Sequence, residues 1–331
     1  MDRKTRSPSR QDPRDDRVMI RKFTLGDLPA DVSTYNEAEA GNPDFRRFTP
    51  EDFRKHLLED PHYQPEGHFV AVKDGLLVAS ARAGFHPEIA KVRGPEACFR
   101  IHVIPSYLGK PVEKEIFGKV ADYLRSRGAE WIVTRVDTRY TAMVGLLERL
   151  GFTKSDYQNH GMERETQGVT EPEVPGGYRI RAADIPDEVE VLHGVMTEAF
   201  STRVKFVPMP LSRFRRHQVL EDPGNFSGIL LAERIADGKP VGMIMSAVDR
   251  EFNAERNTRR GTSYALSVLP PERKRGLGTA LLMKSARWIG SKGMDTAYLS
   301  VNVSNLDALG IYQKAGYKTV QVYQGYRISL A

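Results

Sequence analysis

Hydrophobic and polar positions in the second half of the chain follow two periods in turn, one typical of strands and one of amphipathic helices. The expected strands span residues 178–181, 228–234, 241–250, 262–269 and 296–303, and two further strands close the chain near residue 328. The expected helices span residues 187–200, 213–221, 277–292 and 305–315. This succession predicts an α/β protein with a mixed central sheet flanked by helices.

The first half of the chain repeats this pattern. Residues 102–152 align with residues 267–317 without a gap, and the identical pairs include Val103/Val268, Pro105/Pro270, Gly128/Gly293, Gly145/Gly310 and Gly151/Gly316. Self-similarity of this length predicts two copies of one domain. We place the copies at residues 18–165 and 178–331, joined by a linker rich in proline and glycine at residues 166–177.

Composition is that of a globular protein. The chain has 331 residues, of which 40% are hydrophobic and 28% charged, so two domains with sizeable cores are expected. No apolar run approaches the roughly 20 residues of a membrane helix, and the N-terminus lacks the hydrophobic core of a signal peptide. We therefore expect no membrane partner and a cytoplasmic location. Residues 1–17 carry many charges and almost no apolar side chains, which predicts a disordered tail.

Charge, cysteine and histidine content narrow the function classes. The net charge of +6 is spread along the chain among 43 acidic residues, and no nucleic-acid-binding motif is present, so no nucleic-acid partner is expected. The single cysteine, Cys98, lies in an apolar run and is expected in the core. The eight histidines show no spacing that indicates a metal site, and no metal is expected.

A basic, glycine-bearing turn at residues 270–279 joins an expected strand to an expected helix. Gly276 and Gly278 remove side chains where a ligand must approach the backbone, and the helix that follows presents unpaired N–H groups and its positive dipole end. Arg273, Lys274 and Arg275 add formal positive charge. These three ingredients together predict a site for a pyrophosphate.

The pattern Arg273-x-x-Gly276-x-Gly278 resembles the acyl-CoA pyrophosphate loop of the GNAT N-acetyltransferase superfamily, and residues 305–317 resemble that family's other C-terminal signature. The resemblance implies tandem GNAT domains, acetyl-CoA as co-substrate, and transfer of an acyl group to a primary amine by direct attack. It also implies that the strand before the loop splays from its neighbour, so that the pantetheine amides bond to Leu266 and Val268.

The resemblance implies further residue roles in the second copy. Tyr312 is the expected general acid for the departing thiolate, with packing of the last helix as the structural alternative. Asn305 is expected to contact the coenzyme or to cap its helix. The expected pyrophosphate-binding residues, through backbone N–H groups or charge, are Arg273, Lys274, Arg275, Gly276, Leu277, Gly278 and Thr279.

The first copy departs from the family pattern at the same positions. It has Leu108, Lys110, Pro111 and Glu113 opposite Arg273, Arg275, Gly276 and Gly278, and Leu147 opposite Tyr312. Proline removes a donor, and Glu113 puts negative charge where a pyrophosphate would bind. We expect a degenerate GNAT-like domain that serves packing or shapes the acceptor site; a domain that binds a different ligand in the same cleft is the alternative.

The general base is unassigned. Glu233, Asp249 and Glu251 lie near the expected strand ends and are the candidates, with a water chain to solvent as the default. The acceptor is expected to be a small-molecule or peptide amine, and the basic residues Arg203 and Lys205 would suit one that bears a carboxylate or phosphate. The tandem layout resembles that of the mycothiol synthases, which acetylate a cysteinyl amine, and a non-catalytic acyl-CoA sensor is the alternative from another class. Acyl chain length and oligomeric state are left open.

Overall fold

The computed structural model describes residues 18–60, 62–219 and 222–331; the tail expected at residues 1–17 lies outside them. The helices and strands of the first half are β1 (Met19–Lys22), α1 (Leu28–Ala38), α2 (Pro50–Phe53), β2 (His68–Lys73), β3 (Leu76–Gly84), α3 (Pro87–Arg93), β4 (Glu96–Val103), α4 (Val112–Ser126), β5 (Trp131–Asp137), α5 (Thr141–Arg149) and β6 (Thr153–Glu165). Those of the second half are β7 (Tyr178–Ala182), α6 (Val189–Phe200), α7 (Leu211–Phe214), β8 (Leu230–Arg234), β9 (Pro240–Ala247), α8 (Arg250–Arg256), β10 (Arg260–Val268), α9 (Leu277–Ser291), β11 (Thr296–Asn302), α10 (Leu306–Lys314) and β12 (Lys318–Ser329).

The mixed α/β fold agrees with the expectation, and the elements differ from it in three places. The two expected closing strands are one continuous strand, β12, because bulges after Thr319 and Gln324 let it bend without breaking. The short helix α8, which begins at the N-cap Asp249, was not expected. The helix expected at residues 213–221 is the short α7 followed by one π-helical turn at Arg215–Val219, and residues 220 and 221 lie outside the described part of the chain.

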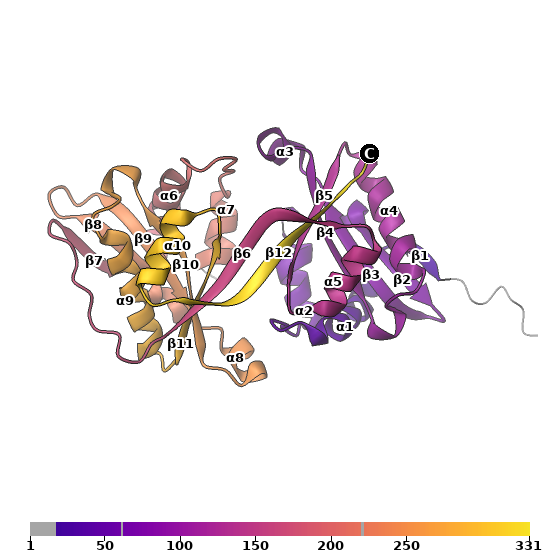
Figure 1. Cartoon of the computed structure of the whole chain (residues 1–331), viewed down its shortest axis with the longest axis horizontal. Helices are drawn as coiled ribbons and strands as arrows, with labels where there is room; N and C mark the ends of the chain where they lie inside the picture. The colour runs from indigo at the N-terminus through magenta and orange to yellow at the C-terminus, as the bar shows by residue number, and fades with distance from the viewer. Residues whose placement is uncertain (1–17, 61, 220–221) are drawn as a thin grey trace, which may run out of the picture.

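The described strands form one 12-stranded sheet in the order β1-β2-β3-β4-β5-β12-β6-β11-β10-β9-β8-β7. The two halves lie side by side, and β6 and β12 cross between them, so that the C-terminus ends on the first half (Figure 1). Residues Tyr323 to Ser329 of β12 pair antiparallel with β5, while residues Asn159 to Glu165 of β6 pair with β11. Each half therefore supplies the strand that extends the other half's sheet.

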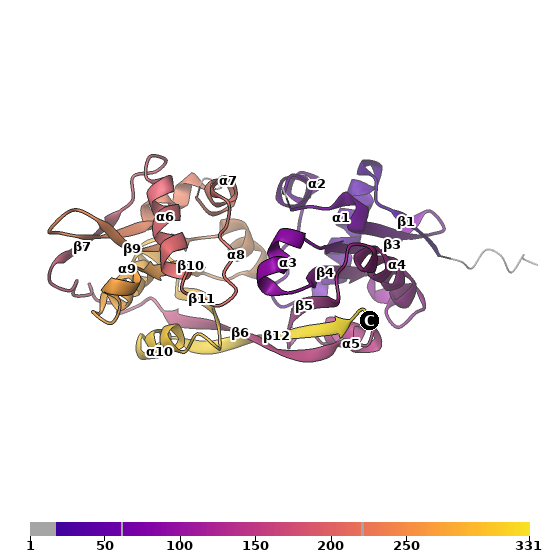
Figure 2. The same ribbon diagram turned by 90° about the horizontal axis from the view of Figure 1, so that it is seen from above.

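Two large hydrophobic cores lie against this sheet, one in each half. Met162 of β6 is buried in the core of the second half, whereas Tyr326 of β12 and Leu330 are buried in the core of the first. In the second half, α6 and α9 both pack on β9 and β10, and β9 is buried along nearly its whole length. Seen from above, α1, α2, α6 and α7 lie on one side of the molecule and α5 and α10 on the other (Figure 2).

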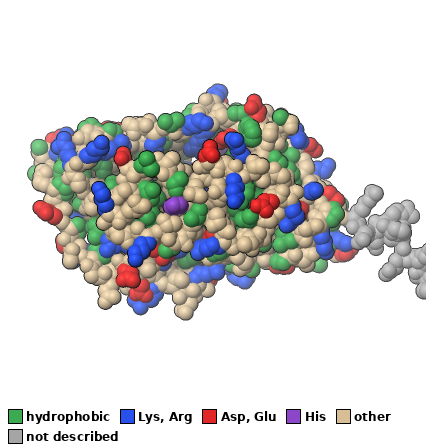
Figure 3. Space-filling view, in the orientation of Figure 1, with side chains coloured by type: hydrophobic (Ala, Val, Ile, Leu, Met, Phe, Trp, Pro, Cys, Tyr) green, Lys and Arg blue, Asp and Glu red, His purple; other side chains and the backbone are tan. Residues whose placement is uncertain are grey.

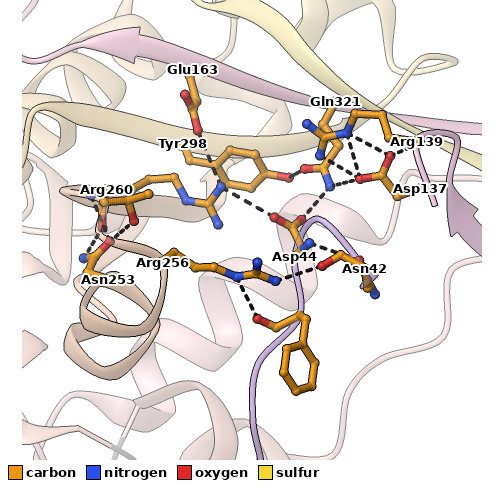
Figure 4. Close-up of polar contacts among 12 residues, drawn as sticks. Asn42, Asp44, Asp137, Arg139, Glu163, Asn253, Arg256, Arg260, Tyr298 and Gln321 are labelled. Atoms are coloured by element: carbon orange, nitrogen blue, oxygen red, sulfur yellow. Dashed lines mark hydrogen bonds and ion pairs between the residues drawn. The ribbon is translucent and has the colours of Figure 1, made fainter. Parts of the chain in front are cut away.

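The junction between the halves is polar (Figure 4). Gln321 of β12 donates from Nε2 to Asp137 Oδ2 over 2.6 Å and to Asp44 Oδ2 over 2.5 Å, and Arg256 of α8 donates to the backbone carbonyl of Asn42 over 2.8 Å. Arg260 Nη1 lies 3.8 Å from Asp44 Oδ1. Gln321 and Asp137 are buried, so these bonds replace lost contacts with water and fix how the halves meet.

The expectation that Cys98 belongs to the core is wrong, because its side chain is exposed. Alternation along β4 buries the neighbouring Ala97 and Phe99 and turns Cys98 to the opposite face. None of the helices in the described ranges is both long and apolar enough to cross a bilayer. On the face shown in Figure 3, Lys and Arg side chains are dispersed over both halves with Asp and Glu among them.

Candidate active site

A cleft opens in the second half where β10 and β11 separate. The two strands pair in parallel only from Arg260↔Thr296 to Thr262↔Tyr298. Beyond that point β10 carries a bulge between Tyr264 and Ser267, with Ala265 at φ +53°, while its other edge stays paired with β9. A cavity of about 680 Å³ lies between the diverging strands. Among the described residues, the edge of β10 that includes Leu266 and Val268 therefore has no strand partner on the β11 side.

The basic turn leads from β10 into α9, at the end of this edge. Gly276 is the N-cap residue of α9 and has φ +85°, a conformation that favours glycine, and no side chain caps the helix. Within the described residues, the backbone N–H groups of residues 274–279 have no hydrogen-bond acceptor. Six consecutive donors at a helix N-terminus fit a pyrophosphate.

Two anchors hold this turn in place. Glu272, which is buried, accepts hydrogen bonds from the Tyr178 hydroxyl over 2.5 Å and from Arg234 Nη1 over 2.9 Å. The Tyr178 bond, helped by the charges of Arg275 and Arg234, lowers the pKa of the Glu272 carboxyl despite the partial loss of solvent. Arg273 donates to the backbone carbonyls of Val268 over 3.0 Å and Ala199 over 2.6 Å.

The three basic side chains of the turn therefore differ in placement. The Arg273 guanidinium joins the turn to β10 and to the end of α6, and it occupies the Val268 carbonyl that we expected to meet pantetheine. Lys274 and Arg275 are exposed, as Arg273 is, but neither has a hydrogen bond to a backbone carbonyl among the described residues. Arg275 Nε lies 3.8 Å from Glu272 Oε2, so its charge is only partly balanced.

Tyr312 projects from α10 into the cavity between β10 and β11. Its side chain is buried, and no hydrogen bond to its hydroxyl occurs among the described residues. Burial raises the pKa of Tyr312 to about 12, and the charge of Arg203 opposes part of this rise. The hydroxyl is therefore protonated at neutral pH and available as a donor. Asn305, which lines the same cavity, is the N-cap of α10 and accepts from the Ala308 N–H over 3.4 Å.

Acidic side chains are missing from the described lining of this cavity. Glu233 is buried on β8 and paired with Arg179 and Arg181. Asp249 caps α8 and lies 3.3 Å from Arg46 Nη1, and Glu251 pairs with Arg46 Nη2. The three candidate bases thus lie outside the cleft that holds Tyr312.

A second cavity of about 440 Å³ shares the side chain of Tyr264 with the first. Its lining comes from both halves and includes Arg46, Asp52, Asp222 and Asp249. Sequence reasoning missed this cavity, because residues about two hundred positions apart form it and no local pattern shows that they meet. Of the basic pair we singled out, Arg203 lines the first cavity, whereas Lys205 donates to the Arg93 carbonyl of the first half.

The corresponding turn of the first half carries its own anion. Glu113 is buried and accepts from the Gly109 N–H over 2.6 Å and from Arg149 Nη2 over 2.7 Å. Leu147, opposite Tyr312 in the alignment, is buried on α5. A carboxylate of the chain therefore binds a backbone N–H of the turn, and the first half has no phenol at the Tyr312 position. No group of three or more His, Cys, Asp or Glu suited to a metal ion occurs in residues 18–60, 62–219 and 222–331.

Comparison with known proteins assigns a family to both halves. The sequence profile described as "Acetyltransferase (GNAT) family" matches residues 34–152 and 193–317. A mycothiol acetyltransferase of Saccharomonospora viridis is 27% identical over 185 residues, which cover 55% of this chain and 60% of the relative. An N-alpha-acetyltransferase of Sulfurisphaera tokodaii is 34% identical over 95 residues, which cover 27% of this chain and 57% of the relative. The chain thus spans about three fifths of the length of each of these relatives.

Solved structures show the same fold. A GCN5-related N-acetyltransferase from Sphaerobacter thermophilus superposes with a TM-score of 0.68 at 19% identity, covering 95% of this chain and 96% of that one. A tandem GNAT protein from the clavulanic acid biosynthesis pathway superposes with a TM-score of 0.70 at 12% identity, covering 95% and 99%. At these identities the likeness concerns the fold alone.

Proposed function

The chain belongs to the acetyltransferase (GNAT) family, and on that premise we propose that its second half transfers an acetyl group from acetyl-CoA to an amine. The observation that carries the proposal is the convergence of three features on one cleft. These are the free edge of β10, the six unpaired N–H groups that lead into α9, and the protonated hydroxyl of Tyr312. The first half, whose turn is filled by Glu113, takes no part in acyl-CoA binding in this proposal.

The residues present fit acetyl-CoA, which would supply the acyl group as an activated thioester. The N–H groups of residues 274–279 would hold the pyrophosphate, with charge from Lys274 and Arg275. Arg273 holds the turn through Val268 and Ala199. The edge of β10 at Leu266 would align the pantetheine chain as an added strand, whereas at Val268 the carbonyl is already bound by Arg273. Asn305 lines the same cavity.

Tyr312 would serve as general acid. The amine attacks the thioester carbonyl carbon, the carbon–sulfur bond breaks, and the sulfur takes the proton of the Tyr312 hydroxyl. The charge of Arg203 beside this hydroxyl favours the phenolate that remains. Because the described lining of the cleft holds no carboxylate, the amine proton leaves through water toward the second cavity.

The second cavity would admit the acceptor. Tyr264 lines both cavities. In the second cavity Asp52, Asp222 and Asp249 would attract an ammonium group, in competition with Arg46, Lys55 and Arg250 of the same lining. The likeness to a mycothiol acetyltransferase and to an N-alpha-acetyltransferase makes a cysteinyl amine and a peptide N-terminus the first acceptors to try. A sensor that binds acyl-CoA without turnover is the second candidate, and the absence of acidic residues from the described cleft lining favours it.

The proposal is tested by measuring the release of the free CoA thiol from acetyl-CoA in the presence of different amines. The amines are cysteinyl glycosides, peptides with free N-termini, aminoglycosides and simple alkylamines. At least one amine is expected to give turnover well above hydrolysis without acceptor. Saturable acetyl-CoA binding with no turnover over the whole panel would favour the sensor.

A further inference from the structure

The first half keeps a cleft of its own between β4 and β5. These strands pair in parallel only from Glu96↔Trp131 to Cys98↔Val133, and a cavity of about 430 Å³ lies beyond. This volume is in the range of small-molecule sites. Its lining differs from that of the second half, because three arginines, Arg82, Arg100 and Arg135, reach it.

Two of these arginines stand directly opposite each other. Arg82 of β3 and Arg100 of β4 are register partners in an antiparallel pair, and like charges in that position destabilise a sheet. Arg82 is partly buried and Arg100 is exposed, and both line the cavity. Partial loss of solvent lowers the pKa of each arginine, and the charge of Arg135 adds to this effect at Arg100. At Arg82 the charges of Asp31 and Glu39 oppose it without a direct contact.

Neither arginine has a carboxylate partner among the described residues. Arg82 donates to His102 Nε2 over a long 3.4 Å and lies 4.9 Å from the centre of the Phe53 ring. Arg100 donates only from Nη1, to the Phe99 carbonyl over 2.9 Å and to the Thr134 hydroxyl over 3.1 Å. A guanidinium group has five N–H donors, so most donors of the pair have no acceptor within the described protein.

The two carboxylates that line the cavity are already bound. Glu39 accepts from His102 Nδ1 over 3.0 Å and from Asn42 Nδ2 over 2.8 Å. Asp137 accepts from Arg139 over 2.7 Å and from Gln321 over 2.6 Å. Neither of them neutralises the arginine pair by contact.

The second half lacks this pair. In each half, one set of three paired residues marks the point where the two parallel strands stop pairing. These residues are Gly84, Cys98 and Val133 in the first half and Ala247, Thr262 and Tyr298 in the second, so the two sets correspond. Two residues further into the cleft on each strand, the pair Arg82 and Arg100 of the first half therefore corresponds to the pair Met245 and Tyr264 of the second. The scaffold folds with uncharged residues at these positions, so the fold does not require the arginines.

We propose that the cavity between β4 and β5 binds a small molecule through a carboxylate or phosphate group held by Arg82 and Arg100. An anion placed between the two guanidinium groups accepts hydrogen bonds from their remaining N–H donors and offsets their repulsion. Phe48, Phe53 and Tyr140 line the rest of the cavity and suit an aromatic or apolar body. Acyl-CoA is not this ligand, because Glu113 and Arg149 fill the turn that would hold its pyrophosphate.

Thermal unfolding of the full chain with millimolar benzoate, phenyl phosphate or inorganic phosphate tests the proposal. Benzamide is the neutral control for benzoate, and chloride keeps ionic strength constant. At least one of the three anions is expected to raise Tm along a saturable curve, because it binds the folded state only. A response to benzoate alone would identify a carboxylate ligand, and a response to the phosphates alone a phosphate ligand.

Arg82→Gln and Arg100→Gln are expected to abolish the rise while leaving the Tm without ligand unchanged or higher, because each removes one of two repelling charges. Arg127→Gln, on the exposed end of α4, loses the same charge away from the cavity and should respond like the natural chain. No saturable rise with any of the three anions, or an equal rise in the Gln variants, would overturn the proposal. So would a large loss of stability in both Gln variants, because the arginines would then be structural.

Discussion

Gln321 and Asp137, although 184 positions apart in the chain, are joined by a hydrogen bond of 2.6 Å between two buried side chains. Gln321 also accepts from the Tyr298 hydroxyl over 3.1 Å. Tyr298 lines the cleft of the second half and Asp137 that of the first, so one amide touches the walls of both. The two halves of the chain are therefore built as one structure, with exchanged strands.

The strand exchange predicts that the second half does not fold well alone. A fragment of residues 177–331 lacks β6, which leaves β11 without one neighbour and the end of β12 without β5. We expect it to associate or to unfold without cooperativity, because long unpaired strand edges aggregate. A fragment that begins at residue 153 keeps β6 and should be more soluble. Sedimentation and thermal unfolding distinguish these outcomes; a monomeric 177–331 fragment as stable as the whole chain would contradict the interpretation.

Close packing around Gly161 of β6 predicts that a side chain added at this position of the junction destabilises the protein. A Cβ atom there would lie 2.5 Å from the Tyr298 hydroxyl oxygen and 3.0 Å from Gln321 Cβ. Gly161→Ala should lower the free energy of unfolding by about 1–3 kcal/mol, because a side chain or the backbone must move. Gly118→Ala in α4, where nothing lies within 4 Å of the added atom, should be neutral or slightly stabilising. Chemical denaturation of both variants tests this. An unchanged free energy of unfolding in Gly161→Ala would show that β6 packs less tightly against Tyr298 and Gln321.

The Tyr312 hydroxyl is expected to matter for turnover and not for binding. Tyr312→Phe should lower kcat by roughly 10²- to 10⁴-fold if protonation of the thiolate limits the rate, while acetyl-CoA affinity is unchanged. Tyr317→Phe is the matched control, because its ring lies 6.2 Å from Tyr312 but outside the lining of the cleft. Steady-state kinetics and calorimetry separate the two effects. Full turnover by Tyr312→Phe would leave this residue a packing role only.

Burial of Tyr312 also predicts the pH profile. The acid must carry its proton, and a pKa raised to about 12 keeps the proton on well past pH 10, the ordinary pKa of tyrosine being about 10. Turnover should rise with pH as the acceptor amine loses its proton, and then stay level through about pH 10. A fall near pH 10 that is present in the natural chain and absent from Tyr312→Phe would show that the phenol titrates normally.

Local patterns in the sequence are sufficient to predict most helices and strands of the second half and the glycine-bearing turn before α9, because periodicity and glycine spacing are properties of neighbouring residues. That this turn binds a pyrophosphate stays a prediction. They do not predict which strand lies beside β5 or β11. β6 and β12 are the last strands of two similar domains, so the local sequence does not show which of them pairs with β5 and which with β11; packing between the halves decides this. The exposure of Cys98 and the role of Arg273 as an anchor were also missed. Both depend on which face of a strand, or which distant carbonyl, a side chain meets. The arginine pair at Arg82 and Arg100 becomes visible only with the strand register.

The central claim is that, within the whole chain, the second half forms an acyl-CoA site and the first half does not. A Cβ atom on Gly278 would meet only Ile311 and Val268 at 3.7 and 3.8 Å, so the fold tolerates a side chain there, and Gly278→Ala is a control with no added charge. Calorimetric titration with acetyl-CoA is the most direct test. We predict one site per chain in the natural protein, binding that survives in Gly278→Ala, and binding that is lost in Gly278→Glu, which copies the Glu113 of the first half. Two equivalent sites per chain, or unchanged affinity in Gly278→Glu, would contradict the claim.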